Sequence, residues 1–251
     1  MPFLPETRLI VDQVEQITER PIRFAEDAAL PVMANLRIAR NGTAEHLMTI
    51  RPGGESLDYM VAYQCGFVLR LYQTPPDRRV DFAGSPSEAA DRMAPLLQAL
   101  VPPGDAAPGL RAVAERMSHW LLLTLRSLPV GLRIEQWLWD KYPALRAQQA
   151  AALERQQEEN AVHIGWRSGK LRFPPQFLAL EAVHALFADR LLGTAYFATP
   201  FEAVGLIEDG RRLFCLLDST PPEPGADRGL VESWGEALGM RDWFHWLAFR
   251  A

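Results

Sequence analysis

Residues 56–72 read SLDYMVAYQCGFVLRLY, and this stretch decides the expected fold. Leu57, Val61 and Val68 recur at helical spacing and form one apolar stripe. Ser56 is a suitable N-cap, and two prolines follow shortly after residue 73. We therefore predict a largely buried helix from about residue 56 to residue 73.

The segment just before this helix changes to an alternating pattern. Apolar and polar residues alternate at 33–40 and again at 44–51, on both sides of Asn41-Gly42. Both turn residues tolerate a positive φ, which favours a tight antiparallel connection. The sequence thus predicts a hairpin at about 33–51, followed directly by a buried helix.

A hairpin that leads into a buried helix resembles the layout of zincin metallopeptidases, among them the small bacterial zincins of the IrrE and ImmA type. Their helix carries HExxH, with two zinc-binding histidines one turn apart and a glutamate between them as general base. In the window YQCGF, Tyr63 and Phe67 lie at the two histidine positions, and Gln64 lies at the glutamate. Gly66 stands where these zincins often have glycine, and Glu135 in a later predicted helix matches a third-ligand position.

The replaced residues change the chemistry that this resemblance implies. Tyr63, Gln64 and Phe67 provide no good zinc ligand at neutral pH. A glutamine also cannot take a proton from water as a glutamate does. The resemblance thus implies a degenerate, zincin-like domain that holds no metal or other cofactor and is not a peptidase.

We therefore expect a non-catalytic binding or assembly protein, a pseudo-metallopeptidase that acts as a subunit of a larger complex with a protein partner. The C-terminal stretch RDWFHWLAF is dense in aromatic residues, and we expect Trp243, Phe244 and Trp246 to be exposed as a partner surface. The sequence leaves the oligomeric state open. The candidate binding residues are Tyr63, Gln64, Cys65, Arg70, Glu135, Trp243 and Trp246.

The alternative function is a hydrolase whose non-standard site uses Cys65, His46, Glu135 and Arg70. Packing offers a simpler explanation for several of these residues. A cysteine on the apolar stripe of a helix interior lacks the cationic neighbour or helix N-terminus that lowers a thiol pKa. A buried arginine such as Arg70 is expected to have a structural ion partner.

The rest of the chain is predicted to be mostly helical. Asp209-Gly210 separates two short runs that read as strands, which predicts a second hairpin at about 203–217. We therefore expect a single, predominantly helical α+β domain over 1–251, with a sub-boundary in the turn-rich loop 101–109. Further helices are predicted at 5–19, 86–100, 110–128, 144–160, 173–193 and 227–239, with a restart of the chain at Pro129.

Composition limits the classes of function. The chain has 251 residues, of which 48% are hydrophobic and 23% charged, as in a soluble globular protein. Its net charge of −5 argues against nucleic acid as a direct ligand. No apolar run reaches the roughly 20 residues that span a bilayer. Two cysteines without a CxxC pair, no visible signal peptide and heavy use of arginine, alanine and proline favour a bacterial cytoplasm.

Overall fold

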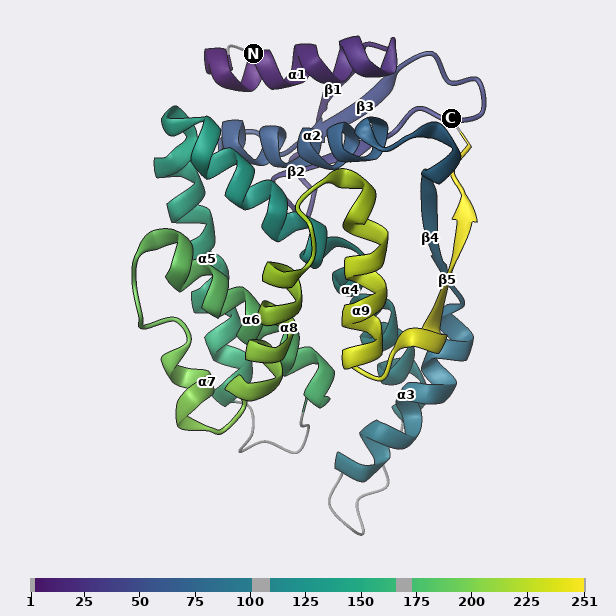
Figure 1. Ribbon diagram of the computed structural model, residues 1–251, viewed down its shortest axis with the longest axis vertical. Helices are drawn as coiled ribbons and strands as arrows, with labels where there is room; N and C mark the ends of the chain where they lie inside the picture. Colours follow the sequence, from purple (N-terminus) through teal and green to yellow (C-terminus); the bar gives the residue numbers. More distant parts are fainter. Residues whose placement is uncertain (1–2, 101–108, 166–172, 251) are drawn as a thin grey trace.

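The computed structural model describes residues 3–100, 109–165 and 173–250 (Figure 1). The predicted class is confirmed at the level of a predominantly helical α+β fold with two small sheets. The helices are α1 (Pro5–Thr18), α2 (Leu57–Gln73), α3 (Pro86–Leu100), α4 (Leu110–Lys141), α5 (Arg146–Gly165), α6 (Pro175–Leu192), α7 (Thr199–Ala203), α8 (Ile207–Ser219) and α9 (Asp227–Ala237). The strands are β1 (Ile22–Glu26), β2 (Ala34–Arg37), β3 (His46–Ile50), β4 (Val80–Gly84) and β5 (Phe244–Ala248).

The first sheet has the order β1-β3-β2, with β1 parallel and β2 antiparallel to β3. The predicted pairing of the two strands around Asn41-Gly42 is confirmed, and both turn residues have a positive φ. The strands end at Arg37 and resume at His46, so the connection is longer than a two-residue turn. Alternate residues of β3 are buried and face the layer of α1 and α2.

The second sheet joins distant parts of the chain. Strand β4 follows α2, and it pairs antiparallel with β5 near the C-terminus (Figure 1). Phe82 of β4 and Phe244 of β5 stack with ring centroids 4.6 Å apart. The two hairpins expected from the sequence therefore share no sheet, because the second of them does not form.

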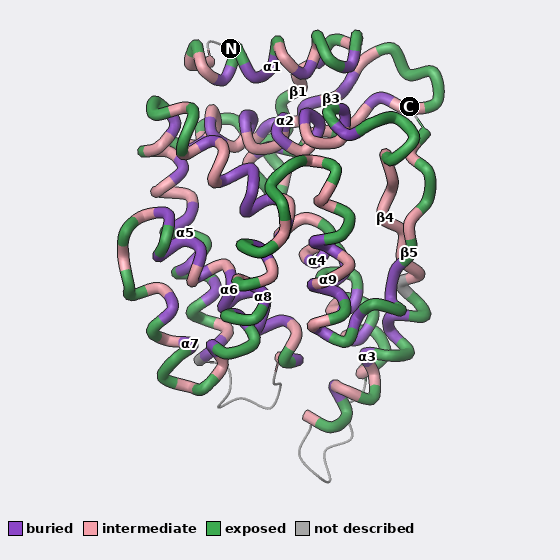
Figure 2. The backbone as a smooth tube through the Cα atoms, viewed as in Figure 1, coloured by how far each residue is buried: buried purple, intermediate pink, exposed green. Residues whose placement is uncertain are grey.

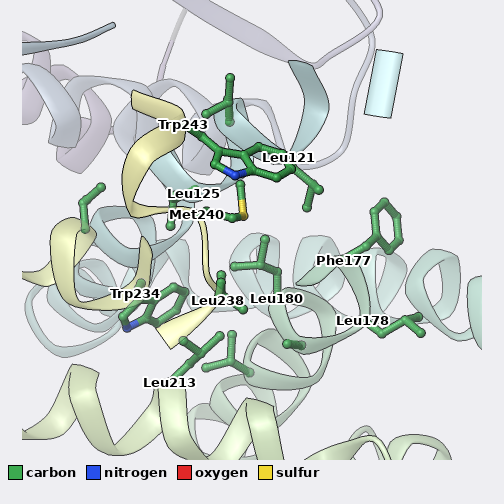
Figure 3. Close-up of a cluster of buried hydrophobic side chains, with 14 of the residues drawn as sticks. Leu121, Leu125, Phe177, Leu178, Leu180, Leu213, Trp234, Leu238, Met240 and Trp243 are labelled. Atoms are coloured by element: carbon green, nitrogen blue, oxygen red, sulfur yellow. The ribbon is translucent and has the colours of Figure 1, made fainter. Parts of the chain in front are cut away.

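Helix α4 connects two hydrophobic clusters. Its N-terminal half packs with α3, α6 and α9 in the larger cluster, around Leu121 and Leu125 (Figure 3). Its C-terminal half contributes Ile134 and Leu138 to the smaller cluster formed by α1, the first sheet and α2. The burial pattern in Figure 2 follows this arrangement, with α2 buried along much of its length; in α4 the longest buried run is 131–135.

The predicted hairpin at 203–217 is wrong, because this segment is helical. Ile207, Gly210, Leu213 and Leu217 are buried, and their spacing of three to four residues is that of a helix face. Gly210 lets α8 lie directly on α6, since a Cβ there would come within 2.7 Å of the Ala182 Cβ. Contact between helices thus overrides the local turn signal.

The predicted restart at Pro129 is also wrong, since α4 runs through this residue. An interior proline removes one helical hydrogen bond and costs about 3 kcal/mol. Pro129 is buried, and packing of α4 against α2, α3, α5, α6 and α9 offsets this cost. The predicted sub-boundary at 101–109 lies, apart from Gly109, outside the described residues. The helices before and after it, α3 and α4, pack against each other.

The other predicted helices form close to their expected bounds. Gly193 ends α6 in the left-handed conformation with φ 68, which glycine adopts without steric cost. Within 3–100, 109–165 and 173–250, no helix combines the length and the apolar character needed to cross a bilayer.

Candidate functional site

The helix with the YQCGF window packs directly against the helix with Glu135. A Cβ on Gly66 of α2 would lie 2.5 Å from Cγ2 of Ile134, and a Cβ on Gly131 of α4 would overlap the Tyr63 hydroxyl. Atoms do not approach so closely, so both positions favour glycine. The sequence residues that suggested a zincin-like site therefore lie at one helix–helix contact.

Glu135 lies inside this contact with both carboxyl oxygens engaged. The Tyr59 hydroxyl donates to Oε1, and Nε2 of Gln149 donates to Oε2 at 2.5 Å. The same Gln149 nitrogen donates to the Glu135 backbone carbonyl at 2.8 Å. Burial raises the pKa of Glu135 to about 7, although the two hydrogen bonds act in the opposite direction. Glu135 thus serves a closed, internal network.

Aromatic rings occupy the two positions at which zincins have histidine. Tyr63 and Phe67 meet edge to face at 5.2 Å, and Tyr59 continues the row at 6.0 Å from Tyr63. Burial, and next the nearby Glu135, raise the pKa of Tyr63, so its phenol stays protonated at neutral pH. A phenol, a phenyl ring and one internally bonded carboxyl group do not form a zinc site. In the described part of the chain, no group of three or more His, Cys, Asp or Glu side chains could hold a metal ion.

The remaining residues of the window differ in environment. Gln64 is half-buried and makes no side-chain hydrogen bond with the described residues. Cys65 is completely buried, and burial raises the pKa of its thiol to about 12. A protonated, enclosed thiol is a poor nucleophile. The expectation that Cys65 packs in the core is confirmed.

His46 is a buried structural residue. Its Nδ1 accepts a hydrogen bond from the Ala39 backbone N–H at 2.9 Å, and its Nε2 lies 2.9 Å from the Thr18 hydroxyl. Since Nδ1 accepts, Nε2 carries the proton and donates to Thr18. Burial, and then the nearby Arg20, lower the pKa of His46 and favour this neutral form. The ring thereby fixes the loop between β2 and β3 to the end of α1.

Arg70 has the structural ion partner that the sequence led us to expect. Its guanidinium donates to both oxygens of Asp227 at 2.7 Å. Arg133 of α4 donates to Asp227 at 2.9 Å and to the Thr220 carbonyl at 3.0 Å. Asp227 lies in the first turn of α9, where the helix dipole also favours a negative charge. These residues hold α2, α4 and α9 together.

A hollow of about 470 Å³ opens beside this ion cluster, between α2, α4, α6 and α8. Arg70 and Arg133 line one side, and the exposed pair Arg190–Asp218 lies at another. Trp137 contributes an aromatic ring to the wall. The hollow has the size of a small-molecule or peptide side-chain site. Its arginines, however, are already paired.

The expected exposure of the C-terminal aromatic residues is wrong for two of the three. Trp243 and Phe244 are buried at 6% and 4% exposure, and both belong to the larger core. Trp246 is half-buried and meets Phe82 edge to face at 5.5 Å. Trp243 and Phe244 are therefore not free for a partner, since both are part of the core.

The structure does not support a shared catalytic site for the alternative hydrolase. Glu135 bonds to Tyr59 and Gln149, whereas Arg70 bonds to Asp227. Among the described residues, His46 bonds to Ala39 and Thr18, and Cys65 is enclosed in the core. No contact between any two of the four proposed catalytic residues joins them into a nucleophile–base pair.

Sequence reasoning missed the residues that complete these networks. Tyr59 and Gln149 hold Glu135, and Asp227 holds Arg70. Tyr59 lies one turn before Tyr63, so helical spacing could have placed it on the same face. Gln149 and Asp227 come from distant helices, and no local pattern connects them to α2.

Comparisons with family models, curated proteins and solved structures gave no significant match.

Proposed function

We propose that this chain is a non-catalytic binding or assembly protein of a bacterial cytoplasm, with a pseudo-metallopeptidase layer formed by α2 and α4. It would act as a subunit of a larger complex with a protein partner. One observation carries this proposal: Glu135 faces α2, as a third ligand would, yet both of its oxygens bond to Tyr59 and Gln149. A layer arranged in this way serves as a scaffold.

The two aromatic side chains on α2 are also consistent with a scaffold role. Tyr63 and Phe67 pack edge to face where metal ligands would stand. Ring packing of this kind contributes about 0.5–1.5 kcal/mol beyond the burial of area. Such a contact stabilises the layer and leaves no donor that could activate water.

Metal analysis of the purified protein tests the absence of catalysis. We expect no stoichiometric zinc, and no peptidase activity that a chelator removes. The triple variant Tyr63→His, Gln64→Glu, Phe67→His tests the layout, because it restores the zincin residues opposite Glu135. We expect this variant to bind one zinc ion per chain, and to lose most of that affinity when Glu135→Gln is added.

Two results would contradict the proposal. Stoichiometric zinc with chelator-sensitive hydrolysis in the unmodified protein would show an enzyme. A folded triple variant that binds no zinc would show that α2 and α4 do not have the zincin layout. The assembly role is tested separately by size-exclusion chromatography of the protein expressed with its genomic neighbours, in which co-elution in one complex is expected.

A further inference from the structure

Two adjoining hollows form one groove with a strong excess of arginine. The smaller hollow, of about 160 Å³, lies between the end of α2, β4, α4 and α9, and the larger, of about 520 Å³, lies along β2. They share Ile38, Arg40 and Arg126, so they are continuous. Six arginines line the smaller hollow and two more line the larger, against three carboxylates. We call this feature the arginine groove.

The positive charge of the arginine groove contrasts with the rest of the chain. The whole protein has a net charge of −5. A local excess of the opposite sign raises the concentration of anions at the groove and speeds their association. This contrast sets the groove apart from an ordinary solvated surface.

The three carboxylates of the groove are already taken. Asp81 receives both guanidinium nitrogens of Arg40 at 2.6 and 2.8 Å. Glu45 pairs with Arg23 at 2.7 Å, and Asp227 is held by the buried cluster described above. These acids therefore neutralise their own partners, and Arg228 pairs with Glu232 of α9 at 3.2 Å, outside the lining of the groove.

Three exposed arginines of the groove have no carboxylate partner among the described residues. Arg37 lines the larger hollow, Arg78 lines the smaller, and Arg126 on α4 lines both. Each hollow therefore has at least two arginines without a carboxylate partner, and Arg126 is common to both. A segment with several separate carboxylates can meet arginines in both hollows, whereas one phosphate group needs several donors at one place.

Three aromatic residues line the groove, and their faces are already engaged: Phe67 meets Tyr63 edge to face at 5.2 Å, and Phe82 and Trp246 pack with β5 and α9. Phe82 stacks on Phe244 at 4.6 Å, and Trp246 has its ring edge-on to both phenyl rings, with the Arg228 guanidinium over it at 5.8 Å. Single-stranded nucleic acids are bound largely through bases that stack on open aromatic faces. The groove therefore favours an acidic peptide over RNA or single-stranded DNA.

We propose that the arginine groove binds an extended, acidic segment of a partner protein through aspartate and glutamate side chains. Arginine forks match carboxylates in a bidentate geometry, and Arg40 and Arg70 already hold aspartates in this way inside the same groove. The inference rests on the proposed function as a binding protein and names the chemistry of its partner.

Fluorescence anisotropy with a labelled peptide of five Glu-Ser repeats tests the groove directly. We expect saturable binding that weakens as salt is added. Arg126→Glu should weaken it about tenfold or more, because a charged hydrogen bond is lost and a repulsion is introduced. Arg155→Glu is the matched control, since Arg155 is also an exposed helical arginine, lies outside the groove and changes the net charge equally. Circular dichroism confirms that both variants are folded.

Several outcomes would overturn the assignment. Equal binding of a Gln-Ser peptide would exclude charge recognition, and equal loss in Arg155→Glu would exclude the groove. If the peptide binds only after its serines are phosphorylated, the groove recognises phosphate and not carboxylate. If a ten-nucleotide poly-U RNA binds more tightly than the peptide, the ligand is a nucleic acid and not a protein segment. If the acidic peptide does not bind but a partner still co-elutes, the groove is not the binding site and the proposed assembly role stands. Zinc-dependent hydrolysis by the unmodified protein would instead contradict the proposed function and leave peptide binding by the groove intact.

Discussion

Replacing Glu135 by glutamine should change the way in which stability depends on pH. Burial raises the pKa of Glu135 from 4.5 to about 7. Between these two values the folded protein retains a proton that the unfolded chain releases. The protein therefore loses stability as pH rises through this window, and the contribution is fully present only below pH 4.5. A glutamine has no proton to release and removes this dependence.

The size of the effect follows from the width of the window. One pKa unit corresponds to about 1.4 kcal/mol, so the window from 4.5 to about 7 is worth about 3 kcal/mol. In the variant, Tyr59 can still donate to the side-chain carbonyl, but the new amide nitrogen faces Nε2 of Gln149. The Gln149 amide must rotate, and its Oε1, which has no partner among the described residues, then accepts the new hydrogen bond.

This rotation has a small cost. It gives up the 2.8 Å hydrogen bond from Gln149 to the backbone carbonyl of residue 135. Such a bond contributes about 1 kcal/mol. We therefore expect Glu135→Gln to be about 1 kcal/mol less stable than the parent below pH 4.5 and about 2 kcal/mol more stable at pH 8.

Urea unfolding followed by circular dichroism from pH 4 to pH 8.5 measures this difference. Other buried groups also titrate, such as Glu181 with its pKa raised to about 9 and His184 with its pKa lowered to about 4, in each case by burial. They are present in both proteins, so their contributions cancel when the two curves are subtracted. A difference that stays constant across the whole range would refute the reasoning.

Three further perturbations test the packing around the site. Asp227→Asn leaves the buried Arg133 uncompensated and should cost about 3 kcal/mol in urea unfolding, whereas the exposed Asp218→Asn should cost less than about 1 kcal/mol; equal costs would contradict the ion cluster. Gly131→Ala should destabilise the protein by about 1–3 kcal/mol through overlap with the Tyr63 hydroxyl, and adding Tyr63→Phe should recover part of this loss; no recovery would point to another cause. A thiol reagent should label only one of the two cysteines in the native protein, because Cys65 is enclosed; rapid labelling of both would show an accessible Cys65.

The sequence determined the helix at 57–73 and the pairing of the strands on either side of Asn41-Gly42. Both depend on local information, namely apolar spacing, turn residues and prolines. The same kind of information identified Cys65 as a core residue and Arg70 as half of an ion pair. It did not name Asp227, which lies far along the chain on another helix.

Tertiary contact decided what local patterns left open or indicated wrongly. The segment with Asp209-Gly210 has a hairpin signal, yet it is helical, because Gly210 lets α8 pack closely on α6. Helix α4 continues through Pro129, since burial along its length outweighs the local cost of a proline. Glu135 likewise meets Tyr59 and Gln149 only once three helices have assembled, and that assembly, not the spacing of residues in the sequence, occupies both oxygens of its carboxyl group.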